Sequence, residues 1–155
     1  MPGALSSAYT RLAIVTAAAA FITLVLGSYI SGTDAALACS GWPLCNGSIF
    51  PGGNSAEGLH MLHRFVAGGL GILIFALAYV GWEERRTSPL LVALPVFAAV
   101  AYIAQALVGA ANIWTTLAAG VVVTHLSLAA LLWCNATGFS AGARSASPVR
   151  RSKHA

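Results

Sequence analysis

The chain has 155 residues, of which 58% are hydrophobic and only 8% are charged, and its formal net charge is +4. A soluble globular domain carries about a quarter of its residues as charged side chains. This composition therefore excludes an ordinary soluble enzyme and indicates a membrane protein. We expect the lipid bilayer, and no nucleic acid, to surround it.

Four apolar segments are long enough to cross a membrane, since a spanning helix needs about 20 apolar residues. None shows the alternation of a barrel strand, so helices remain as the way to satisfy the backbone inside lipid. Pro95 falls in the first turns of the third segment, where a missing N–H costs least. We predict an all-α membrane protein whose residues 1–137 form a four-transmembrane-helix bundle, with helices at about 11–31, 55–82, 90–112 and 115–136.

The basic residues predict how the bundle is oriented. Arg85 and Arg86 lie between the second and third helices, and most of the remaining Lys and Arg residues lie in the tail, residues 138–155. The loop at residues 32–54 has neither Lys nor Arg. Because basic loops stay in the cytoplasm, we predict a multi-pass protein of the plasma membrane with both termini cytoplasmic and this loop outside. The tail is predicted to be a disordered basic segment lying on anionic headgroups.

The outer loop contains the pair Cys39 and Cys45, with Trp42 and Pro43 between them. We call residues 32–54 the Cys loop. In an oxidising compartment such a short loop can close through a disulfide and stay closed. Two roles remain open for this disulfide: a structural crosslink, or a redox pair that exchanges electrons with a group in the membrane.

Two histidines are predicted to lie at similar depth on parallel helices. Asn54 followed by Glu57 resembles a capping box at the start of the second helix. At 1.5 Å per residue, His63 then lies about 13 Å along this helix from Asn54, and His125 about 15 Å along the fourth helix. Ionisable residues at such depth are functional candidates by default, and a facing histidine pair is how a bundle holds a haem iron from both sides. Zinc fits less well, because no carboxylate or cysteine lies at this level.

Three further polar residues of these helices have more than one possible role. His60 lies one turn from His63 and could support that ligand, carry protons or simply lie at the interface. Arg64 could pair with a haem propionate or extend to the outer headgroups. Gln105 of the third helix either bonds to a neighbouring helix or lines a pocket.

In their order along the chain, these motifs resemble the haem A synthase family. The segment from Gly27 to Pro51 is similar to the end of the family's first helix and its outer loop, including the Trp-Pro between two cysteines. HMLHR at 60–64, QALVG at 105–109 and the lone His125 follow in the family's order. The family commonly has eight helices in two similar halves. The resemblance therefore implies a compact, single-bundle version.

The resemblance implies an enzyme, a haem-modifying oxidoreductase that oxidises the C8 methyl of haem O to the formyl group of haem A for cytochrome oxidase assembly. It implies His63 and His125 as the axial ligands of the iron. Arg64 and Gln105 are predicted, from their own chemistry, as further cofactor-binding residues. In the family's catalytic half a Glu often stands three residues before the second-helix histidine, and this chain has His60 there.

That departure predicts His60 or Glu57 for the acid–base part. An alternative function is a b-type haem-binding module that transfers electrons or assists assembly without catalysis. The expected cofactor is haem b, and haem O is expected as substrate. A homo-oligomer could provide a second bundle, and haem O synthase or oxidase assembly factors are candidate partners.

Overall fold

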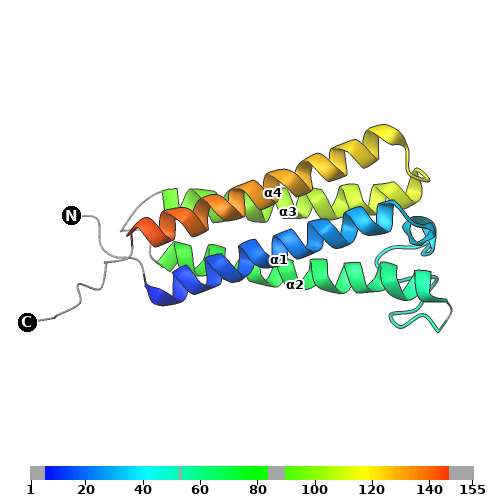
Figure 1. Ribbon diagram of the computed structural model, residues 1–155, viewed down its shortest axis with the longest axis horizontal. Coiled ribbons are helices and arrows are strands. Elements are labelled where there is room, and N and C mark those ends of the chain that lie inside the picture. Colours follow the sequence, from blue (N-terminus) through cyan, green and yellow to red (C-terminus); the bar gives the residue numbers. More distant parts are fainter. Residues whose placement is uncertain (1–5, 53, 84–89, 147–155) are drawn as a thin grey trace, which may run out of the picture.

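The protein, seen in a computed structural model that describes residues 6–52, 54–83 and 90–146, is a bundle of long helices (Figure 1). A short 3-10 helix, η1, lies between the first two of them at Asp34–Leu37. The long helices are α1 at Ser7–Ser31, α2 at Ser55–Glu83, α3 at Leu90–Trp114 and α4 at Ala119–Ala146. All four are long and apolar enough to cross a membrane, which confirms the predicted class of four-helix membrane protein.

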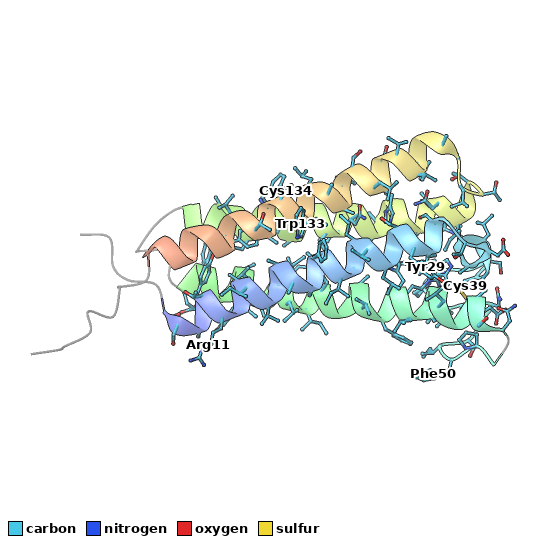
Figure 2. The ribbon with its side chains drawn as sticks, in the orientation of Figure 1. Arg11, Tyr29, Cys39, Phe50, Trp133 and Cys134 are labelled. Atoms are coloured by element: carbon cyan, nitrogen blue, oxygen red, sulfur yellow. A yellow bond between two sulfur atoms is a disulfide. The ribbon has the colours of Figure 1, made fainter. Side chains whose placement is uncertain are left out.

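Each long helix packs against two neighbours. The helix α1 contacts α2 and α4, and α3 contacts the same two, so α2 and α4 face each other across a diagonal of the bundle. The start of α1 and the end of α4 lie at one end, and the Cys loop lies at the other (Figure 1). Arg11 and Cys39 mark these two ends in Figure 2. The side of the membrane that each end faces stays a prediction.

The half of the bundle far from the Cys loop is solidly packed. Its buried side chains include Tyr9 of α1, Leu77 of α2 and Phe139 of α4, each at most 1% exposed. Small residues let the helices approach closely there, as in many membrane bundles; Ala13, Ala17, Ala98, Ala101 and Ala136 all belong to this core. The packed half holds the helices together and leaves the other half free to form a cavity.

The helix α2 begins where the sequence predicts, because the side chain of Asn54 accepts a hydrogen bond from the backbone N–H of Glu57 at 3.0 Å. The helix α1 begins earlier than predicted. There the hydroxyl of Ser6 caps the helix by accepting a hydrogen bond from the N–H of Tyr9 at 3.1 Å. Such caps satisfy backbone donors that have no partner within the helix.

The helix α4 differs from the prediction at both ends. It starts at Ala119 rather than at 115, because Thr116 and Leu117 take left-handed backbone angles, with φ of 48° and 62°. It continues to Ala146, so the prediction of disorder from residue 138 is wrong for 138–146. The buried Phe139 ties this extension to the core. Residues 147–155 of the predicted tail lie outside the described residues.

Candidate functional site

A cavity of about 330 Å³ lies in the Cys-loop half of the bundle. All four long helices line it, and Trp42 and Pro43 of the Cys loop lie at its edge. Most of its wall is apolar or small. Its polar lining includes Thr23 and Ser28 of α1, His60, His63 and Arg64 of α2, Gln105 and Asn112 of α3, and His125 of α4. The cavity therefore has the mixed lining of a site for a large, mostly apolar ligand.

The predicted histidine pair meets in this cavity. His63 on α2 and His125 on α4 belong to diagonally opposed helices, and both line the cavity. From the observed helix starts, they lie about 12 Å and 9 Å along their helices. Each has a buried Nδ1 atom without a hydrogen-bond partner. Buried polar atoms are rarely left unpaired, so both imidazoles are poised for a ligand within the cavity.

Both imidazoles also lie against a glycine of the preceding helix. A Cβ built on Gly27 of α1 would stand 3.0 Å from Cε1 of His63. A Cβ built on Gly109 of α3 would stand at the same distance, 3.0 Å, from Cε1 of His125. The sequence alone did not pair either glycine with a histidine.

Polar groups of α3 complete the wall beside His125. Nε2 of Gln105 lies 3.4 Å from Nε2 of His125, so Gln105 both contacts a neighbouring helix and lines the cavity. Its Oε1 atom and the Oδ1 atom of Asn112 are buried without partners. Asn112 was not singled out in the sequence, although its position two turns after Gln105 puts both on one face of α3.

Towards the other end, the cavity is bounded by Tyr102 of α3. Its hydroxyl donates a hydrogen bond to the carbonyl of Ala67 at 3.0 Å, and its ring lies over Gly71, where a Cβ would overlap it. Because Ala67 is one turn below His63 on α2, this contact joins α2 to α3 just beneath the histidine. Tyr102 thus lies both in the wall of the cavity and against the core of the packed half.

The Cys loop is fixed over the cavity by Arg64. One guanidinium nitrogen donates to the carbonyl of Pro43 at 2.8 Å, and the other donates to the carbonyl of Gly41 at 2.8 Å. The second nitrogen also lies 3.3 Å from Nε2 of His60. Nδ1 of His60 lies 2.8 Å from the carbonyl of Ala35 in η1. Both ring nitrogens of His60 are therefore occupied within the protein.

The loop itself is closed by the predicted disulfide between Cys39 and Cys45. Both sulfurs are buried against Met61 of α2. The side chain of Asn46 donates to the carboxylate of Glu57 at 3.0 Å. Glu57 is thus tied to the loop and is not among the described residues that line the cavity. Acid–base roles for His60 and Glu57 stay predictions.

The donor set fits haem better than a bare metal ion. Among the described residues, no three His, Cys, Asp or Glu side chains come together to hold an ion. Two imidazoles alone lack the further donors that zinc requires. They suit a haem iron, since its macrocycle supplies the remaining ligands. The unpaired Nδ1 atoms of His63 and His125 agree with this chemistry.

The fold and the site define a multi-pass helical membrane protein with a paired-histidine cavity of the kind that holds haem. Over residues 2–137 the sequence matches the family of the cytochrome oxidase assembly protein. The chain belongs to that family, within which the predicted resemblance to haem A synthases is confirmed.

Two curated relatives carry the name heme A synthase. The protein from Bacillus licheniformis is 35% identical over 129 residues, which cover 80% of this chain and 41% of that protein. The protein from Shouchella clausii is 36% identical over 132 residues, covering 83% of this chain and 43% of the relative. The chain therefore spans less than half the length of these relatives.

A third relative has a different name. Protoheme IX farnesyltransferase 1 of Natronomonas pharaonis is 35% identical over 79 residues. The match covers 51% of this chain but only 17% of the farnesyltransferase. A segment similar to this chain therefore occurs there within a much longer protein.

Proposed function

We propose that the chain binds haem between His63 and His125 and takes part, as a haem A synthase, in the oxidation of the C8 methyl of haem O to the formyl group of haem A. One observation carries this proposal: two histidines on diagonally opposed helices line one cavity, each with an unpaired Nδ1 atom. The family and the names of the relatives from Bacillus licheniformis and Shouchella clausii support the reaction.

The residues of the chain would bind, orient and shield the cofactor. A bound haem supplies an iron that accepts and passes on single electrons. His63 and His125 would hold it from both sides, while Gln105 offers amide groups within the cavity. Trp42 and Pro43 of the Cys loop would limit the access of water at the cavity edge. His60 or Glu57 would move protons, and Arg64 would contact a propionate with any donor that the loop leaves free.

The proposed setting is the plasma membrane, with the Cys loop on the outer face. Haem O, the farnesylated substrate, would come from a haem O synthase. The farnesyltransferase of Natronomonas pharaonis supports such a partnership, because a segment similar to this chain occurs within it. Oxidase assembly factors would receive the product. A homo-oligomer would supply the second bundle that the longer relatives contain within one chain.

The decisive experiment analyses haem from cells that produce the chain together with a source of haem O. Haem extracted from these cells should include a formyl-bearing haem, which is absent from cells without the chain. The purified protein should show a low-spin haem spectrum. If haem binds but only haem O or haem B is recovered, the alternative holds and the chain is a b-type haem-binding module. If no haem binds, both functions fail.

A further inference from the structure

We propose that Gly27 and Gly109 are positioning residues that set how His63 and His125 approach a haem iron. This inference rests on the proposed function, since it assigns a role towards the same site. It concerns residues that themselves present no ligand atom. They contribute by having no side chain at the two positions where a helix lies against an imidazole ring.

The two contacts have nearly the same geometry. A Cβ on Gly27 would lie 3.0 Å from Cε1 of His63, 3.6 Å from Nε2 and 3.7 Å from Nδ1. A Cβ on Gly109 would lie 3.0 Å from Cε1 of His125, 3.6 Å from Nδ1 and 3.7 Å from Nε2. In each case the Cε1 edge of the ring points at the glycine, and the nitrogens lie to either side of it.

The matched contacts reflect a repeated arrangement of the helices. In the hairpin of α1 and α2, the first helix gives Gly27 and the second gives His63. In the hairpin of α3 and α4, the first helix gives Gly109 and the second gives His125. Although α2 and α4 are diagonal neighbours, each imidazole lies against the first helix of its own hairpin, and both imidazoles line the cavity that the four helices share.

Other helical glycines lack this relationship. Gly68 lines the cavity, but a Cβ there would meet nothing within 4 Å. The neighbouring Gly69 also has open space within 4 Å and is not among the cavity-lining residues. The close approach to an imidazole is therefore specific to Gly27 and Gly109 among these positions.

A methyl group at either position would displace the ring. Carbon atoms attract each other best at about 3.5–4.0 Å, so a Cβ at 3.0 Å pushes the imidazole away from the glycine by a few tenths of an ångström. The side chain has few alternative rotamers in a helix. Axial bonding to iron depends on the position and the plane of the imidazole. The displacement should therefore change the bound haem more than the fold, since alanine is the better helix former.

The test compares Gly27→Ala and Gly109→Ala with Gly69→Ala and the parent protein, each purified and loaded with haem b. We expect the first two variants to keep the parent's helicity and elution volume without haem. With haem, they should show a shifted low-spin electron paramagnetic resonance signal, a changed midpoint potential and at least several-fold weaker retention. Gly69→Ala should match the parent in every measurement.

The outcomes separate this inference from the proposed function. If the parent binds no low-spin haem, the proposed function fails. If the parent binds it and all three variants have the parent's signal and potential, the positioning role is overturned while haem binding stands.

If an alanine variant folds too poorly to be loaded with haem, a double-mutant comparison in the haem-free protein tests the same contact. Gly27→Ala should lower thermal stability when His63 is present and have no effect in a His63→Ala background. An equal loss in both backgrounds would overturn the contact on which the inference depends.

Discussion

Arg64 of α2 donates a hydrogen bond to the backbone carbonyl of Pro43 at 2.8 Å, across 21 positions of sequence. A second bond, to Gly41, makes the guanidinium a two-point attachment for the Cys loop. The sequence suggested a haem propionate or the lipid headgroups as partners of Arg64, and pairing with a propionate stays a prediction. The contacts present in the bundle already give this cation a structural task.

Arg64→Gln should release the Cys loop from the cavity edge. Hydrogen bonds from a charged donor contribute about 1.5–3 kcal/mol each, and the shorter glutamine cannot make both. In proteoliposomes with the loop accessible, chymotrypsin should cut the loop faster than in the parent, as seen on reducing gels. Arg11→Gln, at the opposite end of α1, is the matched control and should leave the rate unchanged. Equal rates in all three proteins would contradict the attachment.

The disulfide predicts how many thiols react. The chain has three cysteines, two joined as Cys39–Cys45 and the third, Cys134, free. Unfolded in detergent without reductant, each chain should take up one polymer-linked maleimide, and after reduction it should take up three. Uptake of three labels without reduction would show that the bond is absent in the membrane.

Removal of the disulfide should weaken the loop more than the bundle. Closing so short a loop stabilises a protein by about 2–3 kcal/mol in the chain-entropy account. The variant Cys39→Ser, Cys45→Ser should therefore show a lower thermal midpoint with helical content unchanged. Full haem conversion by this variant would end the redox role and leave the structural one.

His63→Leu and His125→Leu should each abolish the low-spin haem spectrum or most of the bound haem, because each removes one of the two proposed ligands of the iron. The absorption spectrum of the purified, haem-loaded protein measures this, with helicity as the check on folding. An unchanged spectrum in either variant would show that the replaced histidine is not a ligand of the iron. His60, which also lines the cavity, would then be the next candidate.

Gly68→Leu should fill the space that the macrocycle needs. Gly68 lines the cavity and Gly69 does not, while neither has a neighbour within 4 Å of an added Cβ. Overpacking an occupied site costs about 1–3 kcal/mol, so haem affinity should fall at least about fivefold in Gly68→Leu. Gly69→Leu should bind haem like the parent. Equal affinity in the two variants would place the haem outside this cavity.

The topology prediction is tested by reporters. A reporter at the C-terminal end should remain in the cytoplasm, and one inserted in the Cys loop should be exported, because this loop carries no Lys or Arg. Export of the C-terminal reporter would show that the bundle has the opposite orientation in the membrane.

Hydropathy was enough to predict the four spans. The fixed rise per residue predicted similar depths for His63 and His125, and both line one cavity. The partners of Arg64 could not be predicted. They are backbone carbonyls, which every residue carries and no pattern marks. The roles of Gly27 and Gly109 could not be predicted for another reason. In the sequence, a glycine that makes room for an imidazole ring cannot be told from one that lets two helices pack closely.

The late start of α4 was missed because the turn has neither glycine nor proline. Thr116 and Leu117 adopt left-handed angles, which side chains with a Cβ rarely take. The continuation of α4 was missed because residues 138–146 have the small and polar composition of a tail. A single aromatic anchor, Phe139, attaches the start of this segment to the bundle.

The uneven packing of the bundle bears on how such a protein matures. The half that contains Tyr9, Leu77 and Phe139 is filled by the chain's own side chains, so it needs no cofactor to bring the helices together. Without haem, the protein can therefore keep its helices assembled in the membrane through the packed half, with the cavity of the other half available to a ligand. Loading with haem would then stabilise the native state by mass action, and the gain would be concentrated in the hollow half.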